Sequence, residues 1–196
     1  MKDVTVAIMA GGKSSRMGTD KSFVLFQGRP LIEVVLERVA GLGAETLLVT
    51  NNPPAYAHLG LPMFSDVLPD NGPLGGIYTA VLRAQNPYVL VVACDMPWLN
   101  PKLLTYQLDL RHAADIVVPR WDKYPEPLHA VYSKACLPAI EASLQAQMLK
   151  ITSFYGRVTV RFVGRKEIEA VDEDGRSFAN LNTPEDLERG TMNDER

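Results

Sequence analysis

Near the N-terminus lies the stretch VTVAIMAGGKSSRMGTDK, residues 4–21. Residues 4–9 form a continuous apolar, β-branched run, which is typical of a central strand covered on both faces. After the glycine-rich part, apolar residues recur at helical spacing from Pro30 to about Gly43. The next apolar run, residues 45–50, predicts a second strand. These spacings together predict a unit of strand, crossover helix and parallel strand.

The same alternation of apolar strands and amphipathic helices continues along the chain. Further strands are predicted over residues 88–94, 115–119, 127–133 and 158–163, and further helices over about 76–84, 101–110 and 134–147, with a short one from Pro184. The pattern predicts the α/β class, with a Rossmann-like open, mostly parallel sheet flanked by helices. We expect one domain over residues 1–190 and a frayed tail over 191–196. Ligands of such sheets bind outside the carboxyl ends of the strands.

Composition narrows the class of protein. The 196 residues carry a formal net charge of −3, with Lys and Arg spread along the chain, so no nucleic-acid partner is expected. The first apolar run is too short to span a bilayer and lacks a signal-peptide cleavage pattern, so we expect a cytoplasmic protein with no membrane partner. Two cysteines, Cys94 and Cys136, favour neither a disulfide framework nor a cysteine metal site.

The glycine-rich loop fits neither of two common nucleotide motifs. An ATPase phosphate loop needs a glycine five positions before its Gly-Lys pair, where this chain has Ala7. A dinucleotide fingerprint runs G-x-G-x-x-G directly into a helix, whereas here Gly11 and Gly12 are adjacent and the helix begins near Pro30. The loop still suits a triphosphate, because glycine amides and nearby cations can face anionic oxygens. The alternative is an ordinary glycine-rich turn.

Four segments resemble signatures of the molybdenum cofactor guanylyltransferase (MobA) family. They are MAGGKSSRMGTDK (residues 9–21), NGPLGGI (71–77), CDMP (94–97) and NLNTPEDL (180–187), and they follow the family order across nearly the whole chain. The resemblance implies a sheet of the nucleotidyltransferase type. It also implies Mg²⁺-dependent transfer of GMP from GTP to the phosphate of molybdopterin, with release of pyrophosphate and formation of molybdopterin guanine dinucleotide. Molybdoenzymes or other cofactor-biosynthesis proteins would be further partners.

Asp95 is the candidate metal ligand and a candidate catalytic residue. It directly follows an apolar strand, at the edge where the cleft of such a sheet lies. A carboxylate there is costly unless it is paired or metal-bound, and Mg²⁺ is commonly held by one or two carboxylates together with substrate phosphates. The alternative is that Asp95 only caps the turn before Pro97.

The resemblance also implies residues for GTP and its phosphates. Arg16 and Lys21, the other candidate catalytic residues, would hold the β- and γ-phosphates, since a guanidinium and an ammonium both bind phosphate oxygens. Asp66 would accept hydrogen bonds from guanine, unless it caps a turn. Asn51 is preferred to Asn52 as a further nucleotide contact. Backbone contacts to GTP are expected from Met9, Ala10, Gly11 and Gly12.

The resemblance also implies four residues for the pterin side of the site: Gly72, Gly76, Asn180 and Asn182. Gly75 and Gly76 are expected to open a helix whose N-terminus attracts an anion. Where the family commonly has an arginine, this chain has Lys150 nearest, which keeps the charge and loses the bidentate fork. His129 is assigned no base role. Three aromatic residues could shape a pterin pocket or simply pack: Trp98, Trp121 and Tyr124.

Other functions stay open at this point. A sister enzyme could use CTP on the same pterin, or another nucleotide on a sugar phosphate. Similar CTP enzymes carry Ala-Gly where this chain has Gly11-Gly12, which favours GTP. A non-catalytic cofactor-delivery module would be expected to lack the metal acid and the phosphate-binding cations, yet Asp95, Arg16 and Lys21 are all present.

Overall fold

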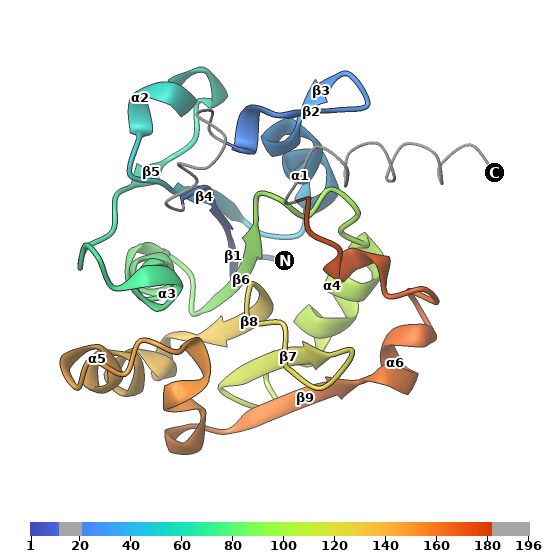
Figure 1. Cartoon of the computed structure of the whole chain (residues 1–196). Coiled ribbons are helices and arrows are strands. Elements are labelled where there is room, and N and C mark those ends of the chain that lie inside the picture. Colours follow the sequence, from blue (N-terminus) through green and yellow to red (C-terminus); the bar gives the residue numbers. More distant parts are fainter. Residues whose placement is uncertain (12–20, 182–196) are drawn as a thin grey trace.

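The fold is built on one large sheet (Figure 1), seen in a computed structural model that describes residues 1–11 and 21–181. The strands are β1 (Val4–Met9), β2 (Leu25–Phe26), β3 (Arg29–Pro30), β4 (Glu45–Val49), β5 (Met63–Phe64), β6 (Tyr88–Ala93), β7 (Ile116–Arg120), β8 (His129–Ser133) and β9 (Val160–Gly164). Within the described ranges, seven of them form the sheet in the order β5-β4-β1-β6-β8-β7-β9, and β2 and β3 form a small separate hairpin.

Helices connect and cover these strands. They are α1 (Leu31–Val39), α2 (Pro53–Tyr56), α3 (Gly72–Arg83), α4 (Pro101–Asp109), α5 (Leu137–Gln145) and α6 (Arg165–Glu169). Short 3-10 helices are η1 (Lys21–Phe23), η2 (Ala57–Leu59), η3 (Lys134–Cys136), η4 (Ile151–Arg157) and η5 (Arg176–Phe178).

The centre of the sheet is parallel. β1 pairs in parallel with both β4 and β6, so that Ala7 lies beside Leu47 on one side and Val91 on the other. All three side chains are completely buried. This confirms the unit of strand, helix and parallel strand predicted for the first 50 residues. The reason is that a continuous β-branched run is stable only where both faces of the strand are covered.

β8 is the antiparallel member between β6 and β7. Its first residue, His129, pairs with Val92, near the carboxyl end of β6. β7 runs parallel to β9 and antiparallel to β8. The start of β8 and the ends of β6, β7 and β9 therefore meet at one edge, and the Rossmann-like, mostly parallel α/β fold predicted from the sequence is confirmed.

Two layers of helices enclose the sheet (Figure 1). On one face α1, α4 and α6 pack on a core that contains Val4, Val6 and Ile8 of β1. On the other face α3 and α5 pack on a core that contains Ala7 of β1. Successive strand side chains point to opposite faces, so one strand supplies both cores.

Several predicted boundaries need correction. α3 starts at Gly72, four residues before the predicted start at Gly76, because Pro73 suits the first helical turn. Pro138 likewise lies in the first turn of α5 after the 3-10 helix η3, so that no helix is interrupted there. The strand predicted over 158–163 is β9, which begins at Val160. The helix from Pro184 and the tail over 191–196 lie outside the described residues.

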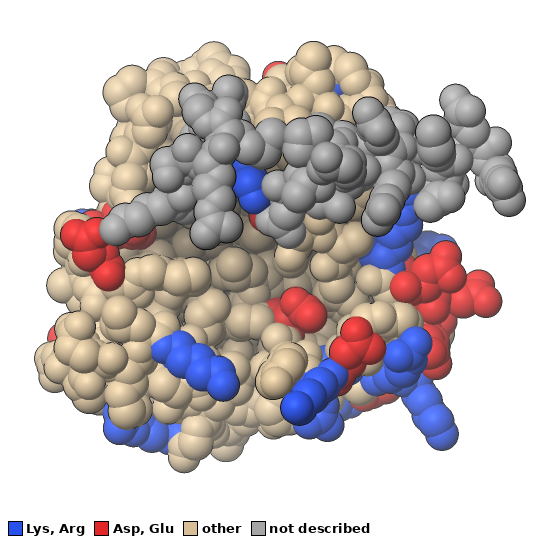
Figure 2. Space-filling view, in the orientation of Figure 1, with Lys and Arg blue, Asp and Glu red and all other residues tan. Residues whose placement is uncertain are grey.

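Cys94 and Cys136 are buried thiols and form no disulfide with each other, and Figure 2 shows charges of both signs scattered over the visible face. None of the helices described within residues 1–11 and 21–181 is both long and apolar enough to cross a membrane.

Candidate active site

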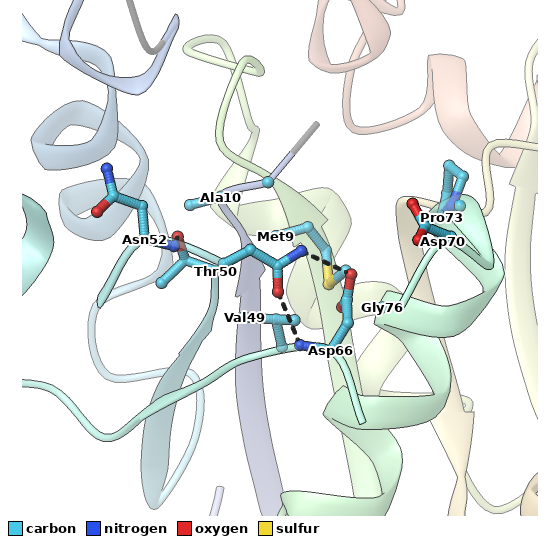
Figure 3. Close-up of a pocket in the computed structure, with 12 residues that line it drawn as sticks. Met9, Ala10, Val49, Thr50, Asn52, Asp66, Asp70, Pro73 and Gly76 are labelled. Atoms are coloured by element: carbon cyan, nitrogen blue, oxygen red, sulfur yellow. Dashed lines mark hydrogen bonds between the residues drawn. The ribbon is translucent and has the colours of Figure 1, made fainter. Parts of the chain in front are cut away.

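A pocket of about 650 Å³ opens at the carboxyl ends of β1 and β4, beside the first turns of α3 (Figure 3). It is lined by Met9, Ala10, Gly11, Val49, Thr50, Asn51, Asn52, Asp66, Asp70, Gly72, Pro73 and Gly76. Seven of these residues were predicted from the sequence, as either nucleotide or pterin contacts. Parallel strands that end at the same edge bring them together, which is the usual place for ligands in such sheets.

Asn51 and Asp66 form a reciprocal pair at the pocket wall (dashed lines in Figure 3). The Asn51 amide Nδ2 donates to Asp66 Oδ2 at 3.0 Å, and the Asp66 backbone N–H donates to Asn51 Oδ1 at 2.9 Å. The short edge strand β5 makes this possible, because Phe64 pairs beside Val49 and both chains then leave the sheet together. The loop after Asp66 is tied to α3, since the Val67 N–H donates to Thr79 Oγ1 at 3.0 Å.

Gly76 lies inside α3, under the side chain of Met9 (Figure 3). A Cβ at Gly76 would lie 2.4 Å from Met9 Cε and 3.5 Å from Asp66 Oδ1. The expectation that Gly75 and Gly76 open the helix is wrong, because α3 begins at Gly72. The glycine is needed because β1 and α3 approach each other closely at the pocket floor.

Asp95 follows β6 at the same edge but does not line this pocket. Burial raises the pKa of its carboxyl, and its own backbone hydrogen bond and the positive charge of Lys21 act in the opposite direction. A partly buried carboxylate beside a lysine fits a magnesium ligand, since Mg²⁺ needs one or two protein carboxylates and takes other ligands from substrate and water. Among residues 1–11 and 21–181, no group of three acidic, histidine or cysteine side chains could hold a metal without a substrate.

The C-terminal motif reaches the Asp95 turn. The Leu181 N–H donates to the Asp95 backbone carbonyl at 3.0 Å, which places the exposed Asn180 next to that turn. Segments 86 positions apart in the sequence thus meet at the end of β6. Gly12, Arg16 and Asn182, which were predicted site residues, lie outside the described residues.

Other candidates from the sequence lie away from the pocket. His129 is completely buried, has its ring edge-to-face with Phe178 at 5.0 Å, and has no hydrogen-bond partner on either ring nitrogen within the described chain. Burial lowers its pKa to about 4. Trp98 packs on Phe26, Trp121 lies under the Arg165 guanidinium, and Tyr124 and Lys150 are exposed. Packing is what the structure shows for both tryptophans.

Comparison with known proteins places this site in a family. The model of the MobA-like NTP transferase domain matches residues 6–158. The chain belongs to this family. A MobA-like transferase is a nucleotidyltransferase, so the predicted family and enzyme class are confirmed.

Relatives of this MobA-like transferase match it over nearly their whole length. It is 39% identical to the "Probable molybdenum cofactor guanylyltransferase" of Pelotomaculum thermopropionicum, over 95% of this chain and 91% of the relative. It is 35% identical to the "Molybdenum cofactor guanylyltransferase" of Desulfosudis oleivorans, over 96% and 95%. The crystal structure of molybdopterin-guanine dinucleotide biosynthesis protein A from Archaeoglobus fulgidus has a TM-score of 0.83 at 27% identity, covering 98% of this chain and all of that one.

Sequence reasoning missed part of the pocket. Thr50 and Asp70 line it and were not predicted as site residues, and Asn52, to which Asn51 was preferred, lines it as well. The signal for two of them was available, because they come directly before and after Asn51 at the end of a predicted strand. Asp70 had no such signal, since it lies in the loop between β5 and α3.

Proposed function

We propose that one nucleotidyltransferase domain, spanning residues 1–190, transfers GMP from GTP to the phosphate of molybdopterin. A phosphate oxygen of molybdopterin forms a bond to the α-phosphorus of GTP, the bond from that phosphorus to the bridging oxygen breaks, and pyrophosphate leaves. The observation that carries the proposal is the Asn51–Asp66 pair in a glycine-lined pocket, at the edge of the sheet where Asp95 follows β6. The names of the full-length relatives support the choice of substrates.

Asp66 is proposed to read the base. Guanine presents two neighbouring donors, N1–H and the N2 amino group, and one carboxylate can accept from both. Asn51 donates a hydrogen bond to Oδ2 of Asp66 and accepts one from the Asp66 backbone N–H. These two bonds fix the direction of the carboxylate. Met9, Ala10 and Gly11 line the pocket at the end of β1, and their backbone would supply the further nucleotide contacts.

The phosphates are proposed to extend from this pocket toward Asp95. Lys21 and Arg16 would bind the β- and γ-phosphates and stabilise the charge of departing pyrophosphate. Asp95 would hold Mg²⁺, which when bound neutralises charge around the α-phosphate and the leaving group. Burial raises the pKa of Asp95, and the positive charge of Lys21 opposes this effect by favouring the ionised carboxylate.

No side chain needs to act as a strong base. The attacking phosphate of molybdopterin is already ionised near neutral pH, so positioning and charge neutralisation can supply most of the acceleration. This agrees with the state of His129, which is buried and is not among the residues that line the pocket. The pterin would lie beside Gly72, Gly76, Asn180 and Asn182, with Lys150 as a more distant cation.

The test is a transfer assay with purified protein, Mg²⁺ and molybdate-loaded molybdopterin, run separately with GTP, CTP, ATP and UTP. We expect pterin guanine dinucleotide and pyrophosphate with GTP only, and neither with the Asp95→Asn variant. A cytosine dinucleotide would move the chain to the CTP-using sister enzymes. Absence of product with every nucleotide would favour a sugar-phosphate substrate or a cofactor-delivery role.

A further inference from the structure

The two charged residues proposed to act on the phosphates have neighbours that touch each other. Ser22 follows Lys21, and Cys94 precedes Asp95. The Ser22 hydroxyl donates to Cys94 Sγ at 3.1 Å, although the two residues are 72 positions apart. The Tyr56 hydroxyl donates in turn to Ser22 Oγ at 2.8 Å. A chain of three side chains therefore connects η1, α2 and the end of β6.

This chain is buried. Ser22 is 1% exposed, Tyr56 is fully buried and Cys94 is 9% exposed. The Phe23 ring packs against the Tyr56 ring with 4.9 Å between centroids, so apolar groups also hold η1 against α2. Hydrogen bonds in such surroundings are costly to break. A buried hydroxyl that loses its partner is still removed from water, and no other group replaces the lost hydrogen bond.

The contact restricts where the two charges can lie. Neighbouring Cα atoms are about 3.8 Å apart, so fixing Ser22 against Cys94 also limits the separation of the Lys21 and Asp95 backbones. The positive charge of Lys21 acts to lower the pKa of Asp95, against the effect of burial, as expected for two charges that the contact keeps on one side of the sheet. An alanine at position 22 would fill much of the same space and would lack the directional tie.

We propose that Ser22, bonded between Tyr56 and Cys94, is a positioning residue that holds Lys21 and Asp95 in register for the phosphates. The inference rests on the proposed transfer reaction for the roles of those two charges. It assigns Ser22 and Tyr56 no contact with substrate; they act through the backbones of η1 and of the turn after β6.

The variants Ser22→Ala and Tyr56→Phe each remove one oxygen from the chain. The matched control for activity and Tm is Tyr132→Phe, which removes a buried hydroxyl that donates to the Pro127 carbonyl at 2.8 Å, on a residue that pairs with Val89 near the start of β6. Ser143→Ala, which removes a buried hydroxyl of α5, is the control for hydrogen exchange. We expect Ser22→Ala to lower kcat about tenfold, because displacements below 1 Å already slow reactions that depend on positioning. The Mg²⁺ concentration for half-maximal rate should rise several-fold, while Tm falls no more than in Tyr132→Phe.

Two further variants separate positioning from packing. Cys94→Ser keeps an acceptor for Ser22 and should retain most of the activity, whereas Cys94→Ala should resemble Ser22→Ala. The double variant Ser22→Ala/Tyr56→Phe should be no slower than Ser22→Ala alone, because both changes act through one hydroxyl. Wild-type kcat and Mg²⁺ dependence in Ser22→Ala, or additive losses in the double variant, would overturn the inference.

Hydrogen exchange tests the tie even if the wild type transfers no nucleotide. Ser22→Ala should speed amide exchange in residues 21–26 and also in 93–98, and Ser143→Ala should change neither segment. Faster exchange in 21–26 alone would refute the tie between the two turns. A wild type without transfer activity but with coupled exchange would count against the proposed reaction and leave the tie supported.

Discussion

Where β1 and β4 end, the side chains of Asn51 and Asp66 face an open pocket of about 650 Å³. Beyond β6 the same edge of the sheet is closed by His129 and by the rings of Trp121 and Phe178. In the open half, the side chains of Asn51 and Asp66 bond each other, and their oxygens can still accept hydrogen bonds from a ligand. In the closed half, a histidine is buried with no hydrogen-bond partner on its ring in the described chain.

The direction of the strands explains this difference. The open half consists of parallel strands, each of which ends at the edge and delivers a loop to the pocket. The antiparallel strand β8 begins at that edge, and the loop before it returns against the end of β7, where the Glu126 N–H donates to the Pro119 carbonyl at 2.9 Å. Asp95 lies between the halves, at the end of β6. The reversed strand β8 thus accompanies the closed part of this edge, and the parallel strands β1 and β4 accompany the open part.

Asp95→Asn should have the largest effect on catalysis. We expect transfer to fall about 10³-fold or more, because the variant loses the charge that holds the metal. Because burial raises the folded-state pKa of Asp95, the folded protein binds a proton more tightly there, and the ionised form costs stability as pH rises. The variant should therefore unfold at a higher temperature at pH 7, without Mg²⁺ or nucleotide, and the gain should shrink toward pH 3. Unchanged transfer would remove Asp95 from the mechanism.

In the closed half, Gly175→Ala should lower the free energy of unfolding strongly. Gly175 has φ of 61°, and a Cβ there would lie 2.3 Å from Cε2 of the Trp121 ring. Strain and a clash with a rigid ring should lower the free energy of unfolding by about 2–4 kcal/mol, measured by urea denaturation. Gly156→Ala is the control, since within the described part of the chain no atom beyond its immediate neighbours would lie within 4 Å of the new Cβ. Equal stability of the two variants would contradict the close packing inferred around Trp121.

Gly76→Ala places an equally close contact in the open half and should give a different result. The atom met is Met9 Cε, the end of a flexible side chain, which can move toward the pocket. We expect GTP affinity to fall about fivefold, roughly 1 kcal/mol, with little change in Tm. Adding Met9→Ala should restore affinity in a titration. A large loss of stability with normal affinity would show that the pocket floor is as rigid as the closed half.

His129→Phe should change the pH dependence of stability and leave transfer unaltered. The folded-state pKa of about 4 lies below the ordinary value of 6.5, so the unfolded chain binds more protons between these values. Stability of the wild type should then be full above pH 6.5 and decline as pH falls toward 4. The variant should show a flatter profile over this range in thermal unfolding. A parallel profile for both proteins would mean that His129 is hydrated or paired.

The sequence was informative where periodicity was long. The six-residue runs of β1 and β6 predicted a parallel sheet and placed Asp95 at its edge. β5 was missed because two residues are too few to show alternation, so the pairing of Asn51 with Asp66 could not be foreseen. The start of α3 was misplaced because the Gly75-Gly76 pair resembles a helix opening, whereas its real cause is the close approach of Met9. The contact of Ser22 with Cys94 has no local signal at all.

The most direct test of the account is an equilibrium titration of the wild type and of Asp66→Asn with GTP and with CTP in the presence of Mg²⁺. Asp66→Asn keeps an acceptor for Asn51 and loses the charge and an acceptor for guanine. We expect the wild type to bind GTP at least about tenfold more tightly than CTP, and we expect Asp66→Asn to lose this preference while His129→Phe retains it. Wild-type affinity for GTP in Asp66→Asn would contradict the claim that the open half of the sheet reads the guanine base.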